Sequence, residues 1–398
     1  MRGNSYSIIK EANRQLLLNT IQEKGSITVA ELLYTTHLSR PTIEMLLRVL
    51  QAERIVEENG CVRGAIGRSS KAYSICGGHY FSIGVDFEYP SLHISAVNLN
   101  REAVCTENYH FSKSDTSSQV IRKMIEMIHE VIRRIPRKEE VIELLGIGVG
   151  ISGMIDRKSR ESISIERLPS WQHIRLPELL EKEFKIPVHM RNDVHMLSRI
   201  RQDLRSSAGL DDYLYISMRS GIGMALYFHK KMYSGTLGNA GFFGHTTLDI
   251  NGPLCCCGNR GCLETYLSAA QLCANYALLS NQNIEYDELL ERFNQHDPNA
   301  KEVLHQAYQI LGKAISNVLK ITDMQHIVIS GLPKVGTNQL VQWILEGIRS
   351  NILPDISSHV VIETEELDGQ EAVGAGIYIL KHFFTDPKLI VKPEELQH

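Results

Sequence analysis

The apolar residues of the first eighty positions recur at helical spacing in three successive segments. The first segment ends at Gly25 and places five apolar side chains near one face, namely Ile8, Ile9, Leu16, Leu17 and Ile21. A shorter segment, ITVAELLYTTH, turns Leu32 and Leu33 inward. The third segment begins at Ser39 and Pro41, a capping side chain and a first-turn residue that both favour a helix start. Its predicted buried stripe consists of Ile43, Leu46, Leu47 and Leu50.

Two short helices joined by a tight turn are typical of a helix-turn-helix, whose second helix enters the DNA major groove with its N-terminal residues first. After these helices, IVEENGCVRGAIGRSSKAYSI predicts two strands around a flexible basic turn, which is a wing. We therefore predict a winged helix-turn-helix domain over residues 1–79. The expected DNA-binding residues are Ser39, Arg40, Thr42, Arg48 and, near the wing tip, Arg68. A three-helix protein-interaction module is the alternative.

From residue 80 onward, strands and helices alternate. Hairpin-like strands are predicted in YFSIGVDFEYPSLHISAVNLN and again in DDYLYISMRSGIGMALYFHKKMY, and helices and buried strands such as VIELLGIGVG and HIVISG follow each. This alternation indicates an α/β body with helix-covered sheets. Two successive sets predict two related lobes with a cleft between them. The first lobe is expected over residues 80–196, joined by a C-terminal helix of about 370–398, and the second over 197–369.

The composition of the chain limits the cellular compartments in which we expect it. Its 43% hydrophobic and 22% charged residues are ordinary for a globular protein. The sequence has no apolar run of about 18 residues and no apolar core of a secretory signal at its start, so we expect a cytoplasmic protein that does not enter a membrane. In a reducing compartment, clustered cysteines are metal ligands or redox thiols more often than disulfides.

The net charge of −4 is divided unevenly along the chain. Residues 1–80 contain ten Lys/Arg and seven Asp/Glu, a balance of +3, which leaves 32 basic and 39 acidic residues, or −7, for the remainder. This asymmetry indicates that the N-terminal part is the one that meets an anion such as DNA.

A series of motifs in the body gives a more specific prediction. In order, GIGVGISGMID, RNDVHM, SGIG, GNAGFFGH and CCCGNRGCLE resemble the ROK (repressor, ORF, kinase) family over essentially the whole chain. The most specific element is Gly-His followed, after nine intervening residues, by CxCGNRGCLE. The resemblance implies an actin-like (ribonuclease H-like), two-lobed sugar-kinase fold. A winged helix in front of it is typical of the regulators in the family, of the xylose-repressor, NagC and Mlc type.

The cysteine cluster matches the zinc site of that family. The set His245, Cys255, Cys257 and Cys262 supplies one imidazole and three thiolates, which form a closed tetrahedral set without an open position for catalysis. We therefore expect one structural Zn²⁺ per chain and interpret Cys256 as a spare thiol. The resemblance also implies that His245 turns its other ring nitrogen to a sugar and that Glu264 binds a sugar hydroxyl.

The family kinases also supply counterparts for a catalytic base and a sugar pocket. Asp193 matches their catalytic Asp, Asn192 matches a sugar-contacting Asn, and Gly153 lies on a turn that borders their sugar site. For Asp193, a helix-capping carboxylate is the alternative. Phe242 replaces a glutamate of the family's Gly-Glu-x-Gly-His, so the ligand is a different sugar, a derivative, or absent. Trp171 lies either beside the pocket or in the core.

The segments that hold phosphate in family kinases are altered here. Where those kinases read approximately Asp-x-Gly-Gly-Thr, this chain reads Asp-Phe-Glu-Tyr-Pro from Asp86. Glu88 places a negative charge where phosphate would lie, and Pro90 removes a backbone donor. The loop at 219–223 is partly preserved, and the later glycine pair has become Gly-Leu-Pro at 331–333. We therefore expect no enzymatic activity, with Asp193 a vestigial base.

These inferences together predict a sugar-responsive repressor of carbohydrate uptake or metabolism genes. It would bind double-stranded operator DNA as a homodimer or homotetramer and sense a sugar through Gly153, Asn192, Asp193, His245 and Glu264. Three alternatives stay open at this point: a regulator controlled by a protein partner, a constitutive DNA-binding protein with a vestigial body, and an active ATP-dependent sugar kinase.

Overall fold

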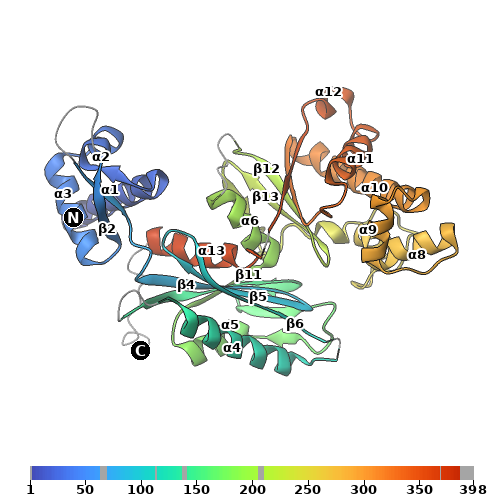
Figure 1. Ribbon diagram of the computed structural model, residues 1–398, viewed down its shortest axis with the longest axis horizontal. Helices are drawn as coiled ribbons and strands as arrows, with labels where there is room; N and C mark the ends of the chain where they lie inside the picture. The colour runs from blue at the N-terminus through green and yellow to red at the C-terminus, as the bar shows by residue number, and fades with distance from the viewer. Residues whose placement is uncertain are drawn as a thin grey trace.

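The computed structural model describes residues 2–62, 70–112, 114–136, 141–204, 210–367 and 369–385. Figure 1 shows an N-terminal domain at one end, a first α/β lobe in the middle and a second α/β lobe at the other end. The predicted wing residue Arg68, and residues 386–398 of the predicted C-terminal helix, lie outside the described residues. None of the helices described in these ranges is long and apolar enough to cross a membrane.

The N-terminal domain contains the predicted helices and wing strands. Its helices are α1 (Arg2–Lys24), α2 (Val29–Thr36) and α3 (Arg40–Ala52). Its antiparallel sheet has the order β1-β3-β2, with β1 at Ile27–Thr28, β2 at Val56–Val62 and β3 at Ser70–Ile75. Ser39 caps α3 by accepting a hydrogen bond from the backbone of Thr42, so the predicted start of this helix is confirmed.

The buried stripe of α3 is also confirmed, since Ile43, Leu46, Leu47 and Leu50 are all buried. The stripe predicted for α1 is partly wrong. Leu17 and Ile21 are buried, but Leu16 is 42% and Ile9 57% exposed, while the side chain of Ile8 lies outside the described set. The inner face of α1 contains Leu18 instead, because a residue two positions away, such as Leu16, points about 200° around the helix.

The first lobe is built on a five-stranded sheet of order β11-β7-β4-β5-β6. The strands are β4 (Tyr80–Glu88), β5 (Ser91–Asn98), β6 (Ala103–His110), β7 (Glu143–Ile151) and β11 (Val188–Asn192). Helices α4 (Ser117–Arg134) and α5 (Leu176–Phe184) cover one face, and α13 (Val373–Thr385) covers the other (Figure 1). A Cβ on Gly84 or Gly148 would lie about 2 Å from a carbonyl oxygen of α13 or the residue just before it, so glycine permits this close packing.

The second lobe repeats this topology. Its sheet has the order β14-β13-β12-β15-β16, so in both lobes a three-strand antiparallel meander continues into two parallel strands. The strands are β12 (Tyr213–Met218), β13 (Ile222–Phe228), β14 (Lys231–Tyr233), β15 (His326–Ser330) and β16 (Val361–Glu365). The helices are α7 (Glu264–Leu267), α8 (Ala269–Ser280), α9 (Tyr286–Asn294), α10 (Pro298–Thr322), α11 (Thr337–Arg349) and α12 (Pro354–Ser357), with a 3₁₀ turn η1 at Phe243–His245.

Two smaller features complete the body. A three-stranded sheet of order β10-β9-β8 extends the first lobe, with β8 at Met154–Asp156, β9 at Glu161–Ser164 and β10 at Gln172–Ile174. Helix α6 (Asp193–Asp203) follows β11 directly and packs against strands of both sheets. The predicted α/β architecture of two related lobes behind a winged helix is therefore the one that the structure has.

The N-terminal domain is joined to the first lobe by specific polar contacts. Tyr80 donates a hydrogen bond to the backbone oxygen of Glu53 at 3.0 Å. Arg101, in the turn between β5 and β6, donates to the side chain of Gln22 on α1 at 2.9 Å and to the backbone oxygen of Asp203 on α6 at 2.6 Å. The domain that carries α3 is thus attached to the same arginine that contacts the C-terminal end of α6.

Candidate functional site

A cavity of about 90 Å³ lies between the two lobes. The five residues predicted to contact a sugar all line it: Gly153, Asn192, Asp193, His245 and Glu264. Phe242 lines it as well. Trp171 is fully buried, packs against Phe87 and donates to the hydroxyl of Ser162 at 2.8 Å, so of its two interpretations the core position is the correct one.

Backbone geometry explains how two of these residues are held. Gly153 has φ +85°, and a Cβ there would lie 2.1 Å from the backbone oxygen of Ser164, so only glycine fits this turn. Asn192 ends β11, and its side-chain oxygen accepts hydrogen bonds from the backbones of Val194 and His195 at 3.1 and 3.3 Å. The capping role considered for Asp193 therefore belongs to Asn192.

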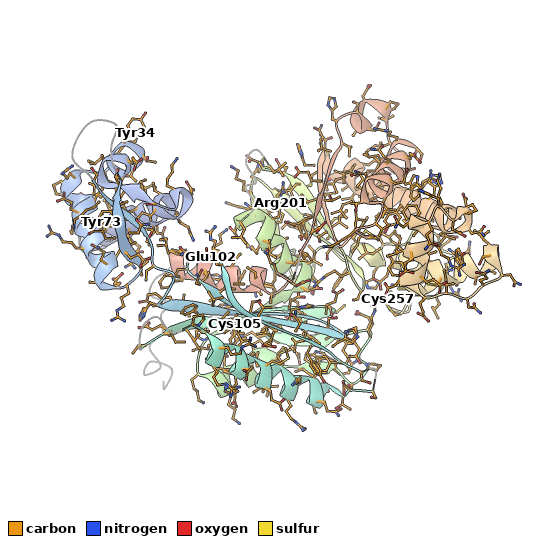
Figure 2. All side chains as sticks on the ribbon, viewed as in Figure 1. Tyr34, Tyr73, Glu102, Cys105, Arg201 and Cys257 are labelled. Carbon is orange, nitrogen blue, oxygen red and sulfur yellow. The ribbon has the colours of Figure 1, made fainter. Side chains whose placement is uncertain are left out.

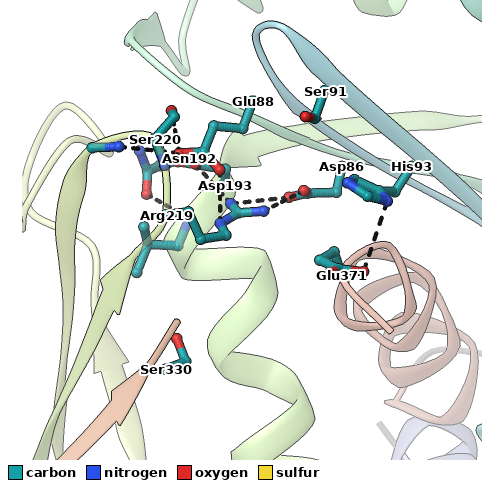
Figure 3. Close-up of polar contacts among 12 residues, drawn as sticks. Asp86, Glu88, Ser91, His93, Asn192, Asp193, Arg219, Ser220, Ser330 and Glu371 are labelled. Atoms are coloured by element: carbon teal, nitrogen blue, oxygen red, sulfur yellow. Dashed lines mark hydrogen bonds and ion pairs between the residues drawn. The ribbon is translucent and has the colours of Figure 1, made fainter. Parts of the chain in front are cut away.

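Asp193 instead belongs to a buried charge cluster centred on Arg219 (Figure 3). The guanidinium of Arg219 lies 2.5 Å from Asp86, 2.8 Å from Glu88 and 3.0 Å from Asp193. Asp86 and Glu88 come from β4 in the first lobe, whereas Arg219 follows β12 in the second. One guanidinium therefore connects the lobes through three carboxylates, and it contacts one carboxylate oxygen, Oδ2, of the candidate base Asp193.

Burial and the neighbouring charges together shift the pKa values of this cluster. Burial raises the pKa of Asp193 to about 7; Arg219 opposes this shift, and the negative charges of Glu88 and Asp86 add to it. Burial also raises the pKa of Asp86. For Arg219, burial lowers the pKa, but the three carboxylates outweigh it and hold the pKa well above its ordinary value.

Glu88 also binds the turn that follows Arg219. Its Oε1 accepts hydrogen bonds from the backbone N–H of Ser220 at 2.9 Å and of Gly221 at 3.4 Å, and from the Ser220 hydroxyl at 2.5 Å. The two segments that sequence comparison with the family kinases assigned to phosphate are thus in direct contact with each other. The residue that departs most from the kinase pattern makes that contact.

The predicted metal ligands also come together in space. One ligand atom from each of His245, Cys255, Cys257 and Cys262 lies within 4.8 Å of all the others. His245 Nδ1 lies 3.6 Å from Cys255 Sγ, and the sulfurs of Cys257 and Cys262 are 3.7 Å apart. A tetrahedral zinc with Zn–S bonds of about 2.3 Å separates two sulfur ligands by about 3.8 Å, so the four side chains fit this ion.

The loop around this centre places its neighbours on the cavity. Cys256 lies outside the four-ligand set and lines the cavity between the lobes, as does the ring of His245. Glu264 begins α7, two residues after Cys262. The metal centre and two of the candidate sugar-binding residues, His245 and Glu264, are therefore parts of one local structure, since residues 245–264 hold both.

Arg167 is a residue of this site that sequence reasoning missed. It lies between β9 and β10 in the first lobe, and its guanidinium contacts Glu264 at 3.2 Å and the backbone oxygen of Ser220, both in the second lobe. Arg167 lines the cavity. No periodicity or motif marks it, because its partners are 53 and 97 positions away in the sequence.

The N-terminal domain presents a second candidate site. Arg40 and Arg48 of α3 share a groove with Gln51 and with Lys71 and Tyr73 of β3, which the sequence analysis did not single out. Thr42 is half-buried, and its hydroxyl lies 2.8 Å from the hydroxyl of Ser39, which caps the helix. Figure 2 shows Tyr34 of α2 at the outer edge of this domain, where it is 84% exposed. Its position on the polar face of α2 could have been predicted from helical spacing.

Comparisons with curated proteins find relatives over nearly the full chain. A xylose repressor of Bacillus spizizenii is 25% identical over 385 residues, which cover 96% of this chain and 98% of that protein. The DNA-binding transcriptional dual regulator NagC of Escherichia coli K12 is 24% identical over 384 residues, with 94% and 93% covered.

Solved structures share the fold, and the family is evident from the body of the chain. A ROK family transcriptional regulator, described as a homologue of the Escherichia coli MLC protein, superimposes with a TM-score of 0.79 at 21% identity, covering 97% of this chain and 99% of its own. A Streptomyces griseus ROK family glucokinase in complex with glucose and AMPPNP gives 0.62 at 21% identity, covering 75% and 98%. The ROK family model matches residues 82–381, which are 300 of the 398 residues, and this chain therefore belongs to the ROK family.

Proposed function

We propose that this protein is a sugar-responsive transcriptional repressor of carbohydrate uptake or metabolism genes. Residues 1–79 would bind operator DNA. The lobes over 80–196, with the C-terminal helix, and over 197–369 would form the sensor and a homodimer or homotetramer interface. Relatives named xylose repressor and N-acetylglucosamine repressor support this assignment.

The observation that carries the proposal is the groove on the N-terminal domain. It gathers three basic residues, Arg40 and Arg48 from the exposed side of a capped helix and Lys71 from the adjacent strand. One acidic residue, Glu44, also lines the groove and pairs with Arg40 at 3.7 Å. Cationic side chains in this arrangement neutralise phosphates, and an arginine near the start of a recognition helix can bind a guanine edge through two hydrogen bonds. The same domain is hydrogen-bonded to a sugar-kinase-like body, which is the arrangement of a ligand-controlled DNA-binding protein.

The sugar would bind in the cavity between the lobes, in contact with Gly153, Asn192, Asp193, His245 and Glu264. Phe242 offers an apolar ring to the C–H face of a sugar. A Zn²⁺ held by His245, Cys255, Cys257 and Cys262 would fix the loop that carries two of these contacts and would take no part in chemistry.

We also propose that the body has no kinase activity. A general base must accept a proton from the sugar hydroxyl, but Asp193 is held by Arg219 at 3.0 Å. Phosphoryl transfer needs a cradle for the phosphates, and the backbone donors of Ser220 and Gly221 bind Glu88 instead. An assay of ATP-dependent phosphorylation over a panel of sugars, with no turnover expected, tests this part.

The DNA-binding proposal is tested by replacing Arg40 with alanine. A target duplex is first selected from a random DNA library, and its affinity for the protein is then measured by fluorescence anisotropy at several salt concentrations. We expect Arg40→Ala to weaken binding by about 10- to 100-fold, because one base-contacting arginine contributes about 1–3 kcal/mol. Arg122→Ala, an exposed position on α4, is the matched control. An unchanged affinity for Arg40→Ala would show that α3 is not the recognition helix.

A further inference from the structure

The turn after β12 has the geometry of an anion site. The backbone N–H groups of Ser220 and Gly221 point at one acceptor, and the Ser220 hydroxyl points at the same atom. Successive N–H groups that converge in a tight turn form a concave site for an anion. Here the acceptor is Oε1 of Glu88, so the anion that occupies the site is part of the protein.

The second oxygen of the same carboxylate is also bound. Glu88 Oε2 lies 2.8 Å from Nε of Arg219, and the Glu88 side chain is largely buried. Two amides, one hydroxyl and one guanidinium thus surround a single carboxylate. A phosphate group receives the same classes of donor in proteins, because its oxygens also accept charge-assisted hydrogen bonds.

The charge around this site disfavours any additional anion. Three carboxylates, those of Asp86, Glu88 and Asp193, share the one guanidinium of Arg219 (Figure 3). The cavity wall adds Glu166 and Glu264 to the acidic side and Arg167 to the basic side. The cavity wall therefore presents four carboxylates, those of Glu88, Glu166, Asp193 and Glu264, and the one guanidinium of Arg167. A phosphoryl group that enters would also have to displace Glu88 from its donors. An uncharged ligand has no such repulsion to overcome.

We propose that Glu88 is a built-in replacement for a phosphate group, and that the cavity accepts an uncharged sugar while it rejects sugar phosphates and nucleotides. This inference rests on the proposed function only in that the cavity binds a sugar. Glu88 belongs to the first lobe and its donors to the second, so the contact that a ligand phosphate would make across the cleft is made by the protein itself.

The test measures binding of inorganic phosphate by isothermal titration calorimetry and ³¹P NMR. Wild-type protein is expected to show no binding at millimolar phosphate. Glu88→Ala frees the donors of the turn and leaves Arg219 paired with Asp86 and Asp193; it should bind phosphate at least tenfold more tightly than wild type. Glu88→Gln keeps the side-chain volume and is the control in case Glu88→Ala does not fold. It should bind phosphate more weakly than Glu88→Ala but more tightly than wild type.

Glu166→Ala removes one negative charge from the same cavity but leaves the donors of the turn occupied by Glu88, so it should bind phosphate far more weakly than Glu88→Ala. Phosphate binding by wild type equal to that of Glu88→Ala, or its absence in both folded Glu88 variants, would overturn the proposal. So would a wild-type thermal shift with glucose 6-phosphate or xylose 5-phosphate as large as that with glucose or xylose. If no uncharged sugar binds, the sugar-sensing function fails, while the phosphate measurements still decide the role of Glu88.

Discussion

Arg219 contacts Asp193 at 3.0 Å across the base of the cleft, and both side chains are buried. The pair brings an arginine from the turn after β12 onto the first residue of α6. Because burial raises the pKa of Asp193 to about 7, its carboxyl group changes charge in the neutral range. Two further carboxylates, Glu88 and Asp86, face the same guanidinium and add to that shift.

This relationship predicts how stability depends on pH. A carboxyl group whose pKa is higher in the folded than in the unfolded chain stabilises the fold. This contribution is fully present at a pH below the ordinary carboxyl pKa, and it is lost as the pH rises through about 7. Asp193→Asn cannot titrate. Between pH 5 and pH 8, the free energy of unfolding of wild type should therefore fall relative to that of Asp193→Asn, by an amount on the order of a few kcal/mol. The melting temperature of wild type, measured over the same pH range, should fall relative to that of the variant. Parallel curves for the two proteins would exclude the raised pKa.

The metal centre predicts a contrast between two neighbouring cysteines. Cys257→Ser removes a ligand, so metal content measured by mass spectrometry should fall from about one ion per chain to a small fraction, and the melting temperature should fall with it. Cys256 lies outside the ligand set, so the Cys256→Ser variant should retain the ion. Equal loss of metal in both variants would mean that Cys256 is a ligand.

Arg167 predicts an increase in sugar affinity on truncation. Its ion pair with Glu264 must be broken before that carboxylate can accept a bond from a sugar hydroxyl. A partly exposed ion pair contributes about 0–1 kcal/mol, so Arg167→Ala should raise the affinity for the responding sugar by up to about fivefold. Calorimetry on the purified protein measures this change. A weaker affinity would instead identify Arg167 as a direct ligand of the sugar.

The contacts of Arg101 predict that the effect of the sugar on DNA affinity can be reduced without changing either affinity itself. It joins Gln22 of the N-terminal domain to the end of α6, whose other end begins at Asp193 in the cavity. Arg101→Ala should leave sugar affinity and DNA affinity each within about twofold of wild type, but it should reduce the effect of the sugar on DNA affinity severalfold. Arg122→Ala is the control. Undiminished coupling in Arg101→Ala would show that the signal does not pass through this contact.

Local signals in the sequence predicted the central elements of the fold better than its edges. The start of α3 was predictable because Ser39 and Pro41 act within one helical turn. Three of the strands that were not predicted, β6, β14 and β16, lie at the edges of the two five-stranded sheets. β6 and β16 have one neighbour each and carry mixed polar residues, AVCTENYH and VIETE, because one side of each strand is open to water.

The same distinction applies to the site. All four metal ligands fall within residues 245–262, so their spacing and the resemblance to the family motif were enough to mark them. The ion pairs of Arg219 with Asp86 and of Arg167 with Glu264 join residues 133 and 97 positions apart. Such pairs depend on how the two lobes close on each other, and no periodicity or short motif records that geometry. The sequence identified Glu88 as a departure from the kinase pattern, but not the turn that it binds.

The attachment of Glu88 to the chain has a consequence for what the protein can measure in a cell. A tethered group has a fixed local concentration at its partner site, which for short tethers is in the millimolar range or above and does not change with metabolism. The concentrations of free ATP and phosphate rise and fall with the energy state of the cell, but the local concentration of Glu88 at the turn stays constant. A sensor built this way reports the supply of a sugar without reference to the energy available to consume it.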